Sequence, residues 1–251
     1  MNAAGAAQRL VEARRTGRLV AGLEGDLLPR DDADAYQVQE AAMRLLGVTQ
    51  AGWKIGAPNP TAVPVAAPLF AALVRPSPAR FSATASSFRA VEAELALALG
   101  RDLPARAAPY GEDEAWDAIA AVHVAIELLD SRYADRRAMP PAALLADQQS
   151  NGGFCYGPAN PLAAADFLAA RASLLFDGKV EKSAVGGNPV GHPKRLVVWL
   201  ANHAASRGRA LRKGDIVTTG SHTGITVAPI GARVTARFEG LGEAVMEIAA
   251  A

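Results

Sequence analysis

Cysteine is nearly absent: Cys155 is the single cysteine in 251 residues, so the chain cannot form an internal disulfide. Such sparse use is typical of proteins that fold in a reducing compartment, and we expect a cytoplasmic protein. No second cysteine stands at CxxC spacing, so Cys155 is interpreted as a small buried hydrophobic residue.

Dense basic runs and long apolar runs are also lacking. Lys and Arg number 26 against 25 Asp and Glu, and no basic run exceeds two residues. Nucleic-acid binding needs concentrated positive charge, so no nucleic-acid partner is expected. No uncharged apolar stretch reaches the length of a membrane span, and the first 15 residues lack the apolar core of a signal peptide. We therefore expect no membrane partner.

What the chain does have is an ordinary globular composition, 50% hydrophobic and 20% charged, which is enough for one sizeable core. Residues 5–16 are rich in Ala and Arg and predict a helix. Residues 31–46 begin with two aspartates and carry apolar residues on one face before Gly47, which predicts a second helix. We expect a helical cap over residues 1–50 and a separate domain over residues 51–251.

After Gly47 the pattern changes to short apolar runs between Gly- and Pro-rich turns, which is typical of strands. The strand-like runs are residues 53–56, 58–68, 91–99 and 122–129, with further segments between 215 and 249. Helices are predicted over residues 112–121, 163–170 and 193–207. This mixture indicates an α+β fold.

Two glutamates interrupt an apolar run. Residues 91–99 alternate strictly, so in a strand Glu92 and Glu94 point to the same side, whereas in a helix they would diverge by about 200°. Parallel carboxylates repel one another unless a cation lies between them, and oxygen ligands favour a hard cation such as Mg²⁺ or Mn²⁺. The alternative is a half-exposed strand whose glutamates face water.

A third carboxylate strengthens the metal hypothesis. Residues 122–129 are apolar except for His123 and Glu127. A buried glutamate is costly unless it is paired or bound to metal, so Glu127 is predicted as a third metal ligand. Arg132 is the alternative partner for Glu127. His123 is interpreted as a core histidine and is not assigned to the metal.

Lys54 stands between two bulky apolar residues and two glycines, in the segment 52–56. A lysine in such a place can neutralise an enolate or a carboxylate. It could equally be an edge-strand lysine whose ammonium reaches water. Two glycine-containing loops, residues 151–153 and 218–224, can offer N–H groups and hydroxyls to a carboxylate, although such residues also form ordinary turns.

These motifs, taken in order, resemble a known family. The order is Gly-Trp-Lys-Ile-Gly, Glu-Ala-Glu, Ile-Glu-Leu-Leu-Asp, Ala-Asp-x-x-Ser-Asn-Gly-Gly, Gly-His-Pro and Leu-Arg-x-Gly-Asp-Ile-Val-Thr-Thr-Gly-Ser. It resembles the 2-keto-4-pentenoate hydratases, which with the 4-oxalocrotonate decarboxylases belong to the fumarylacetoacetate hydrolase superfamily. The similarity runs from about residue 5 to the C-terminus.

The resemblance implies a mixed β-sandwich or β-roll core with a small N-terminal helical part, assembled as a homo-oligomer. It implies Mg²⁺ or Mn²⁺ on Glu92, Glu94 and Glu127, with Lys54 beside a metal-bound 2-oxo acid. The residues that it places near the carboxylate end of the substrate are Thr219, Gly220 and Ser221. His192 also matches a family position, but its place before a helix start suggests a structural role.

Two departures from the family pattern concern the reaction. Val65 stands where the family usually has the aspartate of Pro-Asp-Phe-Gly, and Gln148 stands where it usually has asparagine. Hydration needs a group that accepts a proton from water. We therefore expect Val65 and its neighbours in residues 64–70 to form an apolar wall of the site, and 2-hydroxypenta-2,4-dienoate to be hydrated poorly, while enol–keto tautomerisation or decarboxylation of a related 2-oxo acid is retained. The alternative is that Glu94 or a metal-bound water takes the proton and that Val65 is a packing residue.

The predicted function is that of a metal-dependent lyase on small 2-oxo acids, a hydratase of the 2-keto-4-pentenoate type in the breakdown of aromatic compounds. One alternative is a decarboxylase of the 4-oxalocrotonate type. Another is a C–C bond hydrolase, but those enzymes rely on a histidine base in the N-terminal half, where this chain has only His123. A different class of function is also open: the chain could be a non-catalytic relative that binds a metal or a ligand.

Overall fold

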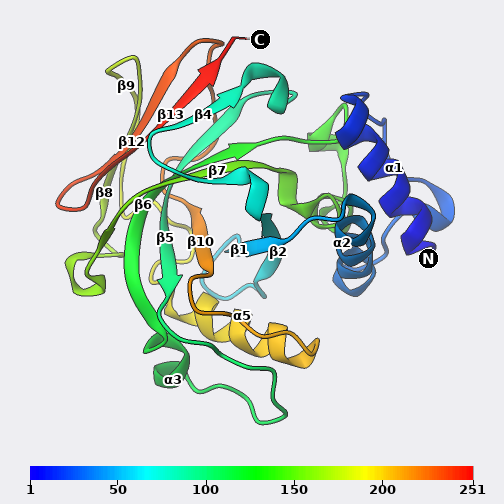
Figure 1. Ribbon diagram of the computed structural model, residues 1–251, viewed down its shortest axis with the longest axis horizontal. Coiled ribbons are helices and arrows are strands. Elements are labelled where there is room, and N and C mark those ends of the chain that lie inside the picture. The colour runs from blue at the N-terminus through cyan, green and yellow to red at the C-terminus, as the bar shows by residue number, and fades with distance from the viewer. Residues whose placement is uncertain (251) are drawn as a thin grey trace.

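The computed structural model describes residues 1–250, which form two curled β-sheets with helices at one end and one side (Figure 1). The larger, eight-stranded sheet has the order β2-β1-β10-β5-β6-β7-β3, and β11 pairs with β5 off this path. The five-stranded sheet has the order β4-β13-β12-β8-β9. This confirms the predicted α+β class, including the small helical part at the N-terminus.

The strands of the larger sheet are β1 (Gln50–Gly56), β2 (Val65–Phe70), β3 (Val74–Pro76), β5 (Ala90–Leu99), β6 (Ile119–Leu129), β7 (Asn151–Asn160), β10 (Ile216–Ser221) and β11 (Thr226–Val227). Those of the smaller sheet are β4 (Ala79–Ser82), β8 (Arg171–Phe176), β9 (Lys179–Val185), β12 (Arg233–Phe238) and β13 (Gly242–Ala249). The helices are α1 (Ala3–Thr16), α2 (Asp32–Leu46), α3 (Glu112–Trp116), α4 (Pro141–Ala146) and α5 (Lys194–Ser206).

The two N-terminal helices begin and end as their sequences predict. The side chain of Asp31 accepts from the N–H of Asp34 at the start of α2, and Gly47 ends the helix with φ 64°, a left-handed value that glycine adopts without strain. Their apolar faces pack together and against α4. Gln39 on α2 donates hydrogen bonds to the carbonyl oxygens of Ala66 (3.3 Å) and Leu145 (2.7 Å), which ties α2 to β2 and α4.

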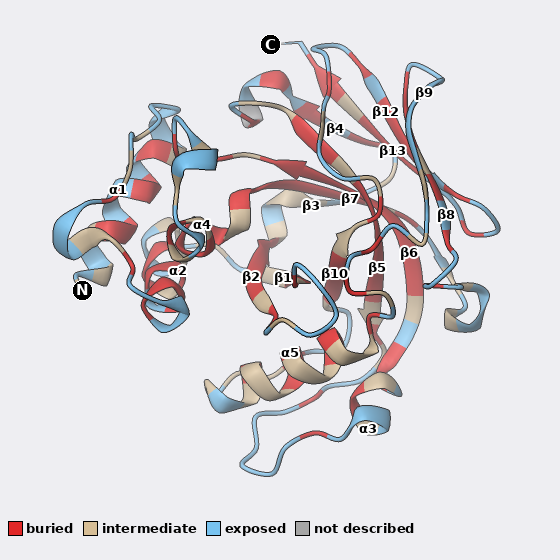
Figure 2. Ribbon diagram, turned by 180° about the vertical axis from the view of Figure 1, so that it is seen from behind, coloured by how far each residue is buried: buried red, intermediate tan, exposed pale blue. Residues whose placement is uncertain are grey.

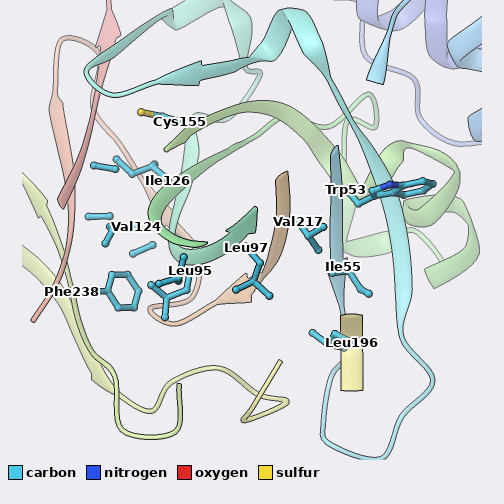
Figure 3. Packing of buried hydrophobic residues seen from close by; sticks show 14 of the residues in the cluster. Trp53, Ile55, Leu95, Leu97, Val124, Ile126, Cys155, Leu196, Val217 and Phe238 are labelled. Atoms are coloured by element: carbon cyan, nitrogen blue, oxygen red, sulfur yellow. The ribbon is translucent and has the colours of Figure 1, made fainter. Parts of the chain in front are cut away.

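The main core lies between the two sheets and continues under α5. Leu95 and Ile126 on the larger sheet belong to the same buried cluster as Phe238 on β12, and Leu196 of α5 packs near Ile55 (Figure 3). Burial follows this arrangement: β5 and β6 are buried along most of their length, whereas β9 is exposed at the outer edge of its sheet (Figure 2).

Three local predictions are wrong. Residues 58–64, expected as part of a strand, lie outside any strand before β2. The helix expected over residues 112–121 stops at Trp116, because the chain enters β6 at Ile119 to bury its β-branched residues in the core. Residues 163–170 form only a 3-10 turn at Leu162–Ala164, since the Asp166 side chain accepts from two following N–H groups and favours a turn.

The division of the chain near residue 50 stays a prediction. Within residues 1–250, no helix has the length and apolar character needed to cross a membrane.

Candidate active site

Four neighbouring strands bring the site together. In the ladder between β5 and β6, Glu92 lies directly opposite Glu127, and Glu94 follows two residues along β5 on the same side. Lys54 on β1 pairs with Thr218 on β10, and β10 lies between β1 and β5. Strand alternation and register thus direct all these side chains to one place, although residues 54 and 218 are far apart in the sequence.

The three glutamates converge. One carboxylate oxygen of each of Glu92, Glu94 and Glu127 lies within 4.8 Å of the others. Glu94 and Glu127 are 1% and 2% exposed, so they do not simply face water. The cluster opens into a cavity of about 180 Å³. Its lining is Lys54, Ile55, Gly56, Glu92, Glu94, Glu127, Leu129, Arg136, Gln149, Thr218, Gly220 and Ser221.

The positively charged side chains near the three glutamates do not balance the negative charge of their carboxylates. Burial raises the pKa of Glu94 well above its ordinary value, and repulsion from Glu127 and Glu92 adds to the effect. Burial also raises the pKa of Glu127 to about 7, against the opposing attraction of Lys54. Three oxygen donors close together, driven toward protonation for want of positive charge, fit a hard divalent cation.

Lys54 is a buried member of the site. Its side chain is 9% exposed and its ammonium makes an ion pair with Glu127, so the alternative of an edge lysine reaching water is wrong. The ammonium also donates to the carbonyl oxygen of Gln149 at 2.7 Å. Arg132, the alternative partner for Glu127, instead pairs with Asp147 and Asp130. The cation that pairs with Glu127 is therefore Lys54, and Arg136 is a second cation in the lining of the cavity.

The carbonyl that holds Lys54 belongs to a strained turn. Gln148, Gln149 and Ser150 have φ values of 47°, 49° and 62°, a left-handed conformation that costs a non-glycine residue about 1 kcal/mol or more. The buried Arg132–Asp147 pair secures this turn: Arg132 donates to the carbonyl oxygens of Asp147 (2.8 Å) and Asn151 (3.1 Å), on either side of it. The surrounding contacts thus fix the Gln149 carbonyl against Lys54.

The loop that ends β10 contributes differently from the expectation. The ladder between β10 and β5 is irregular between Thr218 and Ser221, and Gly220 within it has φ 98°. Gly220 and Ser221 line the cavity, as does Thr218, whose hydroxyl donates to the Glu94 carboxylate. Thr219 is not among the lining residues, because its hydroxyl donates to the backbone oxygen of Leu95 at 2.8 Å.

Polar lining residues that the sequence did not assign to the site are Thr218, Gln149 and Arg136. Thr218 lies in the loop 218–224 that was expected to offer hydroxyls, but its bond to Glu94 depends on the pairing of β10 with β5. Gln149 takes part through its backbone and Arg136 lies in an arginine-rich 3-10 turn, so neither has a local sequence signal.

Val65 is placed away from the cavity. It is half-buried at the start of β2 and packs against the N-terminal helical cluster, and none of residues 64–70 lines the cavity. The expected apolar wall is therefore not present there. Val65 therefore gives no geometric reason to expect poor hydration.

His123 and His192 have structural roles. His123 is buried with Nδ1 2.9 Å from the carbonyl oxygen of Gly157, as a core histidine. Nδ1 of His192 accepts from the N–H of Lys194 at the start of α5. Cys155 is buried, and burial raises the pKa of its thiol to about 11, which agrees with a hydrophobic rather than a reactive residue.

Comparison with known proteins identifies the family. The family model described as fumarylacetoacetate (FAA) hydrolase C-terminal matches residues 62–249. The chain belongs to the fumarylacetoacetate hydrolase family. This family member is 31% identical to a 2-keto-4-pentenoate hydratase of Burkholderia vietnamiensis, over 94% of this chain and 93% of that relative. It is 31% identical to a 4-oxalocrotonate decarboxylase of a Pseudomonas species over 61% of this chain and 57% of that relative.

A solved structure shares the whole fold. The 4-oxalocrotonate decarboxylase of Pseudomonas putida G7, complexed with magnesium and adipate, aligns with a TM-score of 0.86 at 23% identity, over 98% of this fumarylacetoacetate hydrolase family member and 97% of that chain. The same decarboxylase complexed with calcium and acetate aligns with a TM-score of 0.85. The two-sheet architecture and the N-terminal helices thus belong to a known fold.

Proposed function

We propose that this family member is a lyase that depends on Mg²⁺ or Mn²⁺ and acts on small 2-oxo acids, as a hydratase of the 2-keto-4-pentenoate type in the breakdown of aromatic compounds. The convergence of three buried carboxylates with the ammonium of Lys54 carries the proposal. Relatives named as hydratases, about 30% identical over nearly the whole chain, support it. We place the enzyme in the cytoplasm as a homo-oligomer.

Six of the residues that line the cavity have a role in this proposal. Glu92, Glu94 and Glu127 hold the cation, which when bound polarises the 2-oxo group of the substrate and stabilises negative charge on its oxygen. Lys54, next to Glu127, offsets the negative charge that grows as the substrate shifts between enol and keto forms. The Gly220 and Ser221 segment binds the substrate carboxylate through its N–H and hydroxyl groups.

The reaction on 2-hydroxypenta-2,4-dienoate begins when the enol hydroxyl loses its proton and the terminal carbon gains one, which gives a conjugated 2-oxo-3-enoate. The hydroxyl of water then bonds to the fourth carbon, the third carbon gains the other proton of water, and the product is a 4-hydroxy-2-oxo acid. The protein must hold the electron-poor form of the substrate long enough for water to attack. A buried cavity with a fixed ammonium serves this need better than open solvent.

We expect the protein to consume 2-hydroxypenta-2,4-dienoate in the presence of Mg²⁺ at a rate typical of enzymes, on the order of 10 s⁻¹. Loss of the dienoate absorbance, measured with Mg²⁺ and after chelation, tests this. A non-catalytic binder would change the absorbance without consuming the compound. Release of CO₂ from a 4-oxalocrotonate-type substrate, without hydration of the dienoate, would support the decarboxylase instead.

We expect stabilisation by Mg²⁺ to grow as pH rises from 5 to 8. Because burial raises the pKa of Glu127 to about 7, the metal-free folded state holds a proton that the unfolded chain releases near pH 4.3. The metal-free protein therefore loses unfolding free energy from this group as pH rises through that window. Mg²⁺ binds the deprotonated carboxylates and opposes the loss.

Urea unfolding at pH 5 and pH 8, with and without Mg²⁺, measures this effect. The variant Glu127→Gln is the control, because its neutral amide cannot take part in the titration and its Mg²⁺-dependent gain at pH 8 should be small. Equal stabilisation by Mg²⁺ at both pH values in the unsubstituted protein would contradict the proposed site.

A further inference from the structure

A second cavity, of about 290 Å³, adjoins the first. Most of its wall is apolar and comes from four separate parts of the chain. The apolar side chains in this wall are Leu19, Phe88, Tyr133, Ile225 and Val227. We call it the tail cavity. Nothing in the mechanism above uses it.

Arg136 joins the two cavities, because it lines both of them. Its Nε donates to the hydroxyl of Ser150 at 3.0 Å, in the turn whose neighbouring carbonyl holds Lys54. Within residues 1–250 no carboxylate makes an ion pair with Arg136. The shared wall of the cavities is therefore the side chain of Arg136, anchored at one nitrogen to the active-site turn.

Strand pairing gives the distance between the two cavities. Val227 on β11 pairs with Ala90 on β5, two residues before Glu92. A strand advances about 3.3 Å per residue, so the tail cavity begins about 7 Å along β5 from the nearest metal ligand. Leu129 provides a second link, since it lines the metal cavity and its carbonyl oxygen accepts from Ser86, which stands beside the Ser87–Phe88 wall of the tail cavity.

The apolar wall is unusually open to solvent. Leu19, Ile225 and Val227 are 42%, 46% and 56% exposed, so their side chains remain in contact with water in this chain. An apolar group that entered the tail cavity would cover them, and such burial is favourable in proportion to the area removed from water.

We propose that the tail cavity binds the apolar tail of the substrate, so that the enzyme prefers 2-oxo acids with an alkyl or aryl group beyond the five-carbon skeleton. The inference rests on the proposed function, because the 2-oxo acid end must lie in the metal cavity while the tail passes Arg136. Full burial of one methylene favours binding by about fourfold, so three additional carbons favour a substrate by about sixtyfold when fully buried and on the order of tenfold when partly buried.

The test compares kcat/KM for 2-hydroxypenta-2,4-dienoate and 2-hydroxyocta-2,4-dienoate. We expect the unsubstituted protein to favour the longer compound by on the order of tenfold or more. Val227→Trp fills the tail cavity and should remove most of this preference, mainly by lowering kcat/KM for the longer compound. Val180→Trp is the matched control, because Val180 is 53% exposed on β9, outside both cavities, and the preference should be kept.

A binding measurement separates failure of this inference from failure of the proposed function. If neither dienoate is consumed, the hydratase proposal fails, and calorimetry with 2-oxopentanoate and 2-oxooctanoate in Mg²⁺ still tests the cavity. Tighter binding of the longer acid, lost in Val227→Trp, supports the tail cavity. No dependence on tail length, an unchanged dependence in Val227→Trp, or a preference for a tail that ends in a carboxylate overturns it.

Discussion

Replacing Glu127 with glutamine is expected to remove Mg²⁺ binding and turnover together. The amide keeps the shape of the side chain but lacks the negative charge that makes a carboxylate the stronger ligand for a hard divalent cation. Since the cation contributes several kcal/mol to charge stabilisation, activity should fall on the order of a hundredfold or more. The same result is expected for Glu92→Gln and Glu94→Gln, because the three carboxylate oxygens form one cluster.

Calorimetric titration with Mg²⁺ and Mn²⁺, beside steady-state rates, measures both losses. The variants should fold, since burial already favours the neutral form of Glu94 and Glu127. Glu12→Gln is the matched control, because Glu12 is exposed on α1, and it should bind Mg²⁺ normally. Unchanged titrations in all three site variants would show that Glu92, Glu94 and Glu127 do not bind the metal.

Lys54→Met is expected to lower kcat on the order of a hundredfold or more while Mg²⁺ affinity changes little. Methionine keeps much of the volume of the stem and removes the ammonium that lies beside Glu127. The effect falls on kcat because the charge that Lys54 offsets is greatest as the substrate approaches the transition state. Metal binding is spared because the three carboxylates remain.

Measuring kcat and Mg²⁺ affinity separately in Lys54→Met distinguishes these possibilities. Lys179→Met, at an exposed position on β9, serves as the control and should leave both kcat and Mg²⁺ affinity unchanged. A near-normal kcat in Lys54→Met would mean that its ammonium only balances the charge of Glu127. Loss of Mg²⁺ binding in the same variant would show that the lysine acts by positioning a metal ligand.

The parts of the site that could be predicted from sequence are those with a local signal. Strict alternation over residues 91–99 places Glu92 and Glu94 on one side of a strand, and the structure has that strand as β5. Glu127 was recognised because a carboxylate within an apolar run has few ways to be stabilised. The register that sets Glu92 opposite Glu127 depends on sheet pairing, which no short stretch of sequence determines.

Other features depend on contacts between distant segments. The partner of Glu127 is Lys54, 73 residues earlier, whereas Arg132, which is near in sequence, turns to Asp147. Arg136 has the same local surroundings as Arg137, yet only Arg136 lines the metal cavity. Residues 163–170 have the composition of a helix but form a turn, because tertiary packing and an aspartate cap override weak propensity.

The hydrogen bonds of the first two helices limit which N-terminal segments could replace this one in a chimeric protein. Arg14 on α1 donates to the backbone oxygen of Asn151 at 2.7 Å, directly after the left-handed turn, and Gln39 on α2 holds β2 and α4. The N-terminal helices are therefore joined by hydrogen bonds to β2, to α4 and to the residue that follows the left-handed turn at residues 148–150. A chimera that joins this sheet to the helices of another relative would need to keep Arg14 and Gln39 as grafted contacts.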